Sequence, residues 1–288
     1  MKFGFYLLLI LGFVSCNAVN EKDNIITVSI LPLKYLVEEI SGNDYVVNVM
    51  VPPGIEPEIY EPLHSQVKGL TSSRLYIEVG LLEFETSLKE GILNNVSDIK
   101  MLNLSENIEI IKENHSHHDH SHSLNSDPHI WLSPINLKKF NERILSELIE
   151  LNPEANEKYY QNFMILNSRI DSLNNYIQNK LRPCEERTIL IYHPFLGYFC
   201  RDFNLKMLAV DHHGKEPSAR QLKNLYESIS NHNINSVFYQ SQNNEKILKS
   251  LIDETKIAAV EIDPLKYNVI ENLYELTDKI HNSLNNDR

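Results

Sequence analysis

Short apolar runs that alternate with segments of helical spacing constrain the fold of this chain more than any other feature. In the first half, these runs have strand length and occur at residues 25–30, 45–51, 74–80 and 99–104. In the second half, the same rhythm returns at residues 187–192, 206–211, 234–240 and 257–263. Strands that alternate with helices form parallel sheets built from βαβ units. The sequence therefore predicts two α/β halves.

A long stretch between the two halves predicts one continuous helix. It begins at Pro153 and contains no further Pro or Gly before Pro183, while its apolar residues recur every three or four positions. About 28 residues at about 1.5 Å each make a rod of about 42 Å, as long as a domain is wide. We therefore expect an α/β fold of two lobes, each with a parallel sheet flanked by helices, bridged by this helix. The expected bounds are 25–152 for the N-terminal lobe, 153–182 for the linking helix and 183–288 for the C-terminal lobe.

The N-terminus has the pattern of an export signal. One Lys precedes an apolar run from Phe3 to Val14, which is too short to span a bilayer and fits a signal peptide at residues 1–15. The small residue before Cys16 resembles the lipobox of bacterial lipoproteins, although Phe13 stands where that pattern usually has Leu. We expect lipidation of Cys16, a tether at 16–24, and a protein anchored to a membrane in the periplasm or at the cell surface. The alternative is an ordinary signal peptide that is cut nearby.

Charge and cysteine content exclude some functions. The formal net charge is −12 and no stretch forms a basic stripe, so nucleic acid is not an expected partner. Apart from Cys16, the chain has only Cys184 and Cys200. An exported chain can oxidise such a pair, but neither residue has a context that demands a disulfide, and we expect free thiols.

The segment "HSHHDHSHSLNSDPHIW" at residues 115–131 contains six histidines. Neutral imidazole is the commonest metal ligand among side chains. Five of the six lie in an expected polar loop at 114–126, which cannot hold one geometry: His115, His117, His118, His120 and His122. These five could capture cations loosely and raise their local concentration, or they could simply form a solvated loop. His129 stands apart in the motif Asp-Pro-His and is a candidate for a fixed ligand.

Potential metal ligands follow four expected strands, where open parallel sheets bind their ligands. The strand at 45–51 leads to Glu56, Glu58 and Glu61, and the strand at 99–104 leads through the long loop to His129. The strand at 187–192 ends at His193, and the strand at 257–263 ends at Asp263. Carboxylate and imidazole ligands without a thiolate suit zinc, with manganese second. Each residue also has a structural alternative: a helix cap for His129, a strand-end histidine for His193, a turn for Asp263 and a solvated loop for Glu58.

Five stretches together resemble the zinc- and manganese-specific solute-binding proteins of bacterial ABC transporters, a group that includes adhesin lipoproteins. They are "VPPGIEPEIYEPLHSQVKGL", "DPHIWLSP", "YHPFLGYFCRDFNL", "KEPSARQLKNL" and "IDPL". The resemblance covers essentially the whole mature chain. It implies two α/β lobes bridged by a long helix, with a metal ion bound between the lobes.

The resemblance also implies a set of ligands. His129 matches the His of the family's Asp-Pro-His, His193 matches its third ligand, and Asp263 matches the acidic ligand before Pro. The first position departs from the family, because Glu58 stands where a His is usual. We expect Glu58 to bind as a carboxylate. The alternatives are that His64 replaces it, or that a water completes a site of three protein ligands.

The implied function is the capture of Zn²⁺, or alternatively Mn²⁺, outside the cytoplasmic membrane by a monomer that delivers the ion to an ABC permease. One alternative is an adhesin or structural lipoprotein that binds metal only to stay folded. Another is a zinc hydrolase with Glu58 as its base, but no H-E-x-x-H motif and no nucleophile elbow occurs. We therefore expect a protein that is not an enzyme.

Overall fold

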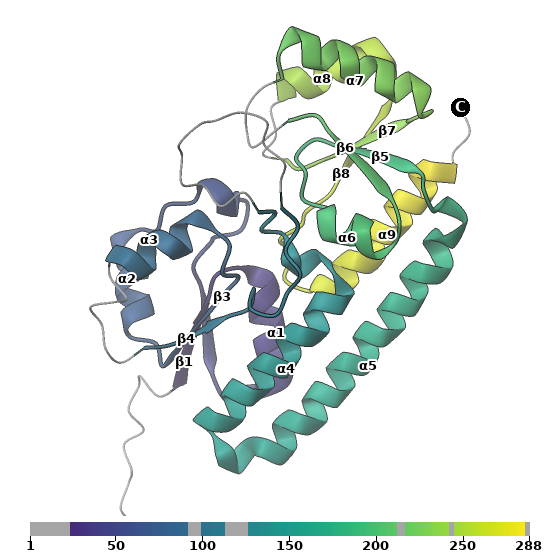
Figure 1. The fold of residues 1–288 in the computed structure, drawn as a ribbon. Helices are drawn as coiled ribbons and strands as arrows, with labels where there is room; N and C mark the ends of the chain where they lie inside the picture. Colours follow the sequence, from purple (N-terminus) through teal and green to yellow (C-terminus); the bar gives the residue numbers. More distant parts are fainter. Residues whose placement is uncertain (1–23, 92–98, 113–125, 212–216, 242–244, 286–288) are drawn as a thin grey trace, which may run out of the picture.

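The computed structural model describes residues 24–91, 99–112, 126–211, 217–241 and 245–285. The expected signal peptide, the lipidation site Cys16 and the five loop histidines lie outside these ranges: His115, His117, His118, His120 and His122. Figure 1 shows two α/β lobes joined along one side by a long helix, as the sequence predicts. Among the described residues, no helix combines the length and the apolar character needed to cross a membrane.

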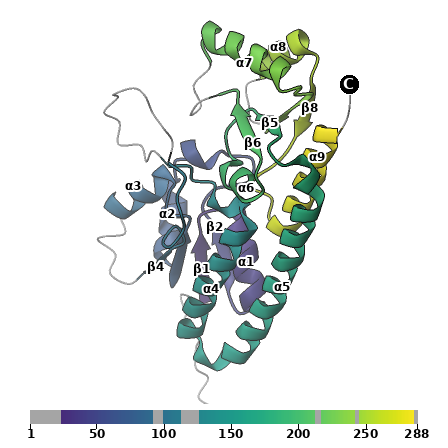
Figure 2. The same cartoon turned by 45° about the vertical axis from the view of Figure 1, so that its right-hand side comes forward.

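The N-terminal lobe is built on a parallel sheet of four strands in the order β2-β1-β3-β4. The strands are β1 (Ile25–Val28), β2 (Val46–Val49), β3 (Leu75–Glu78) and β4 (Lys100–Asn103). The helices of this lobe are α1 (Leu31–Ser41), α2 (His64–Thr71), α3 (Glu83–Gly91) and α4 (Pro134–Leu151), with short 3-10 turns η2 (Pro57–Ile59) and η4 (Ile130–Leu132). In both views α2 and α3 lie on one side of the sheet, and α1 and α4 lie on the other side (Figures 1 and 2).

The C-terminal lobe repeats this topology with the order β6-β5-β7-β8, again entirely parallel. Its strands are β5 (Thr188–Ile191), β6 (Lys206–Ala209), β7 (Ser236–Tyr239) and β8 (Ala258–Glu261). Its helices are α6 (Gly197–Asp202), α7 (Ala219–Asn231), α8 (Glu245–Thr255) and α9 (Val269–Asn285). In each lobe the first strand lies between the second and the third. The chain therefore reverses direction across the sheet beside that strand, where open α/β sheets bind ligands.

The linking helix α5 (Asn156–Leu181) contains 26 residues and is therefore about 39 Å long. The 3-10 turn η5 (Pro153–Ala155) precedes it, and η6 (Arg182–Cys184), which contains Pro183, follows it. Its buried face is the apolar stripe Tyr159, Phe163, Leu166, Ile170, Leu173, Ile177 and Leu181. This face packs against α1 and α4 of the N-terminal lobe and against α9 of the C-terminal lobe. One helix thus packs against both lobes along one side of the molecule (Figure 1).

The apolar core continues from one lobe into the other. A single cluster of buried side chains includes Trp131 of η4 together with Phe195 and Phe199 from the segment after β5. A second, smaller cluster surrounds Val237 and Leu251 in the outer part of the C-terminal lobe. Cys184 and Cys200 are buried as free thiols in the larger cluster, as expected from the sequence.

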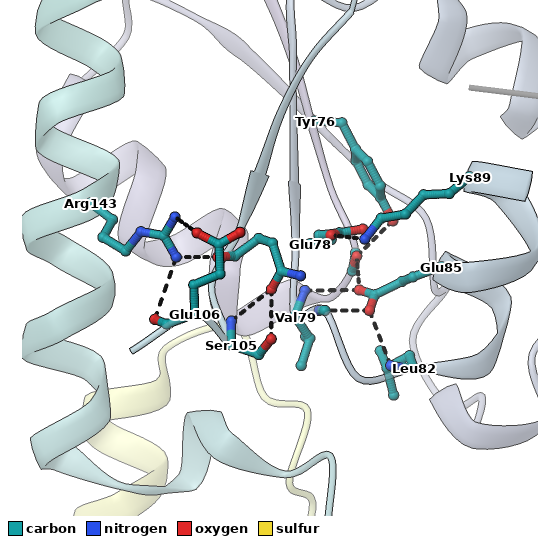
Figure 3. A network of polar contacts seen from close by, with 12 residues as sticks. Tyr76, Glu78, Val79, Leu82, Glu85, Lys89, Ser105, Glu106 and Arg143 are labelled. Atoms are coloured by element: carbon teal, nitrogen blue, oxygen red, sulfur yellow. Dashed lines mark hydrogen bonds and ion pairs between the residues drawn. The ribbon is translucent and has the colours of Figure 1, made fainter. Parts of the chain in front are cut away.

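Buried carboxylates hold the connection between β3 and α3 at the carboxyl edge of the N-terminal sheet (Figure 3). The Glu85 carboxylate is 1% exposed and accepts hydrogen bonds from three backbone N–H groups and one hydroxyl, those of Val79, Gly80, Leu82 and Ser29, at 2.5–3.1 Å. Glu78 is fully buried beside it and pairs with Lys89. The Ser29 carbonyl in turn accepts the N–H of Val51, the second residue of the loop after β2. The network therefore continues to the loop that contains Glu58.

Candidate metal centre

Three side chains from both lobes converge on one point. One potential ligand atom from each of Glu58, His129 and His193 lies within 4.8 Å of the other two. Glu58 Oε1 is 2.6 Å from His129 Nε2 and 3.4 Å from His193 Nε2. Two donors of a tetrahedral zinc ion lie about 3.4 Å apart, because each donor sits about 2.0–2.1 Å from the metal. A small opening of the shorter pair would admit an ion.

Each ligand comes from the carboxyl side of a parallel strand. Glu58 lies in η2, after β2, and the preceding Pro57 favours a helical start because its φ is fixed. His129 stands directly before η4, at the end of the long connection from β4. His193 follows β5 by two residues. Three of the residues predicted as ligands because they follow the carboxyl ends of parallel strands therefore do meet in space.

A buried carboxylate supports each imidazole on the side away from Glu58. Asp127 Oδ1 lies 2.8 Å from His129 Nδ1 and accepts the His129 backbone N–H at 2.9 Å. Asp211, which follows β6, has its Oδ1 3.2 Å from His193 Nδ1. Because an ionised carboxylate can only accept, each pair keeps a hydrogen on Nδ1 and directs Nε2 towards the centre. Asp127 belongs to the N-terminal lobe and Asp211 to the C-terminal lobe.

Neither of these two aspartates is among the site residues that the sequence predicts. Asp127 is the first residue of the Asp-Pro-His motif, in which only the histidine is a predicted ligand. Asp211 ends the apolar run at 206–211, so it also stands at a strand exit. The same rule that selected His193 could therefore have selected Asp211.

The three converging groups shift one another's pKa values strongly. Burial alone would raise the pKa of Glu58, but His129 and His193 hold it well below its usual range. Burial alone would lower the pKa of His129, but Glu58 and Asp127 raise it to about 9. In the same way, Asp211 and Glu58 overcome burial and raise the pKa of His193 to about 10. Positive charge is thus favoured at this point, and a divalent cation would take the place of two Nε2 protons.

Asp263, the expected fourth ligand, is not part of this group. It lies two residues beyond the end of β8, and its side chain is exposed. Its Oδ1 accepts the backbone N–H of Leu265 at 2.8 Å, which is an Asx turn before α9. The turn role that the sequence allowed as an alternative is therefore the one Asp263 has in the structure.

The other acidic and histidine side chains between β2 and α2 are not members of the ligand group found among the described residues. Glu61 and His64 are exposed, and His64 is the first residue of α2. Glu56 is partly buried two residues before Glu58, and burial raises its pKa. Cys184 and Cys200 are not members of the ligand group. The donor set of two imidazole nitrogens and one carboxylate oxygen is one that zinc accepts.

Comparisons with known proteins point to one family. The family model described as zinc-uptake complex component A, periplasmic, matches residues 26–282. A crystal structure of ZnuA superposes with a TM-score of 0.82 at 31% identity, covering 91% of this chain and 99% of that one. A zinc-bound ZnuA deletion mutant gives a TM-score of 0.83 at 30% identity, covering 92% and 99% of the two chains.

A curated relative agrees with these structures. The high-affinity zinc uptake system protein ZnuA of Bacillus subtilis is 24% identical over 83% of this chain and 77% of its own length. The resemblance found in the sequence is therefore confirmed. This chain belongs to the family of periplasmic component A of zinc-uptake complexes, whose members bind metal for transport and are not enzymes.

Proposed function

We propose that this protein captures a divalent transition-metal ion, zinc first and manganese second, and delivers it to the permease of an ABC transporter. The observation that carries the proposal is the convergence of Glu58, His129 and His193 from both lobes within 4.8 Å. Mixed imidazole and carboxylate ligands bind zinc more tightly than manganese in the usual affinity order. Three protein ligands leave one tetrahedral position for a water or for the second oxygen of Glu58. Asp263 would have to give up its bond to Leu265 to fill it.

Native mass spectrometry of the mature chain with zinc or manganese tests the ligand set. We expect one retained ion in the wild type and its loss in His129→Ala, because a buried imidazole with a fixed orientation is removed. Glu58→Ala should weaken retention, whereas His64→Ala, a neighbouring exposed histidine, serves as the matched control and should retain the ion. Retention by His129→Ala at wild-type affinity would exclude this site. Loss of the ion in Asp263→Asn would instead return Asp263 to the ligand set.

Delivery to a permease needs a separate test in cells. We expect that deletion of the gene slows growth under zinc chelation and lowers cellular zinc. The wild-type gene should restore both properties and the His129→Ala gene should not. An adhesin or a structural metal protein predicts normal zinc accumulation in the deletion strain, so that result would contradict delivery.

We also infer that Cys16 is lipidated and anchors a monomeric protein to a membrane. The inference rests on the apolar run followed by a small residue and Cys16. Cys16→Ser should move the protein from the membrane fraction to the soluble fraction without changing its zinc affinity. An unchanged membrane fraction would contradict the anchor, and sedimentation of the soluble form would test the monomer.

A further inference from the structure

The loop that presents Glu58 has little regular structure of its own. It runs from the end of β2 to the start of α2 and contains only the three-residue turn η2. Several of its large apolar side chains are exposed, with Ile59 at 75% and Leu63 at 66%. The two histidine ligands are each held by a further side chain, Asp127 and Asp211, whereas the side-chain partners shown for Glu58 are the two histidines themselves. Something else must therefore hold this loop in place.

The side-chain amide of Gln66, in the first turn of α2, makes hydrogen bonds to both ends of this loop. Its Nε2 donates to the carbonyl of Met50, the residue after β2, at 2.8 Å. Its Oε1 accepts the backbone N–H of Leu63, the last residue before α2, at 2.9 Å. The same oxygen accepts the hydroxyl of Tyr60, two residues after Glu58, at 2.6 Å. One amide group thus closes the loop and fixes a point inside it.

The Tyr60 side chain transmits this restraint towards η2. Its ring is buried and makes an edge-to-face contact with Phe84 of α3, with ring centroids 5.0 Å apart. Gln66 fixes the hydroxyl end of Tyr60 and Phe84 fixes the ring. Because only Ile59 separates Glu58 from Tyr60, a fixed Tyr60 leaves the backbone of Glu58 little freedom.

Helix capping alone does not account for these bonds. A Gln at the third helical position commonly accepts the N–H of the residue that caps the helix. Gln221 does this at the start of α7, where its Oε1 accepts the Ser218 N–H at 2.9 Å. Gln66 makes the equivalent bond to Leu63 but adds the bonds to Met50 and Tyr60, which a cap does not require.

We infer that Gln66 is a positioning residue of the metal centre: its amide closes the loop between β2 and α2 and thereby holds the Glu58 carboxylate against His129 and His193. The inference rests on the proposed metal binding and adds a residue that does not touch the ion. Gln66 acts on Glu58 alone, since the two histidines belong to other loops. This selectivity distinguishes positioning from a general effect on the fold.

The test measures zinc affinity of the mature protein by competition with a chromophoric chelator, in single and double variants. Gln66→Met keeps the side-chain length and removes all three hydrogen bonds, and it should weaken zinc binding about 10-fold or more, the range seen for residues that support metal ligands. In a Glu58→Ala background the same change should cause no further loss. In an Asp211→Asn background, which weakens the His193 side of the site, Gln66→Met should again weaken zinc binding about 10-fold.

Gln221→Met is the matched control, because it removes a helix-capping glutamine far from this loop, and it should leave zinc affinity unchanged. The inference would be overturned if Gln66→Met lowered zinc affinity equally in the Glu58→Ala and Asp211→Asn backgrounds. It would also be overturned if Gln66→Met left the zinc affinity of the otherwise wild-type protein unchanged. A wild-type protein that retains no zinc would instead refute the proposed function. If circular dichroism shows that Gln66→Met does not fold, Tyr60→Phe, which removes one hydrogen bond, should show a smaller loss with the same dependence on Glu58.

Discussion

At the scale of single residues, buried carboxylates organise the N-terminal sheet edge and the metal centre. Asp127 and Asp211 orient the imidazoles of His129 and His193. Glu85 accepts hydrogen bonds from backbone N–H groups of the connection between β3 and α3. Each of these carboxylates is buried and has hydrogen-bond partners, as buried charge requires. Glu58 differs, because its partners are the two histidines that a cation would bind together with it.

Glu85 should make stability depend on pH. Burial, followed by the charge of Glu78, raises the pKa of Glu85 to about 7 in the folded protein, against 4.5 ordinarily. A raised carboxyl pKa means that the folded state binds the proton more tightly. Its stabilisation is therefore complete below pH 4.5 and is lost as the pH rises to about 7, by on the order of 3 kcal/mol.

The measurement is urea unfolding of the metal-free protein at several pH values, with Glu85→Gln alongside. The variant lacks the titrating group, so the unfolding free energy of the wild type minus that of the variant should fall by on the order of 3 kcal/mol as the pH rises through this window. A constant difference for Glu85→Gln would show that Glu85 does not titrate in this range.

At the scale of elements, the segment from β5 into α6 links the ligand turns of the two lobes. Four residues after His193, Gly197 lies so close to Asp127 that a Cβ built on it would be 2.2 Å from Oδ2. The next residue, Tyr198, donates its hydroxyl to the Asp127 carbonyl at 2.8 Å and accepts the Ile111 N–H at 3.2 Å. Helix α6 therefore packs directly on the turn that presents His129.

Gly197→Ala should displace Asp127 and weaken zinc binding about 10-fold or more, because His129 loses its orienting carboxylate. The matched control is Gly69→Ala in α2, where a Cβ would meet nothing within 4 Å. That change should preserve zinc affinity and favour the helix slightly. Chelator competition measures the affinities, and wild-type affinity in Gly197→Ala would contradict the role given to this contact.

At the scale of the whole molecule, the lobes share one core and one long helix. The larger apolar cluster continues across their junction, and α5 packs on helices of both. Trp131 of η4 lies in this junction, fully buried, and its Nε1 donates to the carbonyl of Pro264 after β8 at 2.9 Å. The two lobes are therefore expected to unfold as one unit.

Trp131 is the only tryptophan of the chain, so its fluorescence reports on this junction. We expect urea unfolding followed by Trp131 fluorescence and by far-UV circular dichroism to give the same midpoint, since a shared core makes unfolding cooperative. Zinc should raise both midpoints equally, because it binds the folded state at ligands from both lobes. Separate midpoints for the two signals would show that the lobes unfold independently.

The sequence by itself determined the architecture. Alternating strand and helix periods specify two parallel sheets, and the absence of Pro and Gly between Pro153 and Pro183 specifies the linking helix. These are local properties, because each depends on the spacing of neighbouring residues. The same local rule placed Glu58, His129 and His193 at strand exits, where the structure brings them together.

The tertiary structure alone decided which strand-exit residues face one another. Asp263 satisfied the same sequence rule as His193, but its carboxylate turns to the Leu265 N–H instead of the centre. Asp211 faces His193, and Gln66 closes the loop of Glu58 through bonds to residues as far as 16 positions away. The direction of a side chain after a strand depends on how connections from separate elements pack, and no periodicity in the sequence encodes that packing.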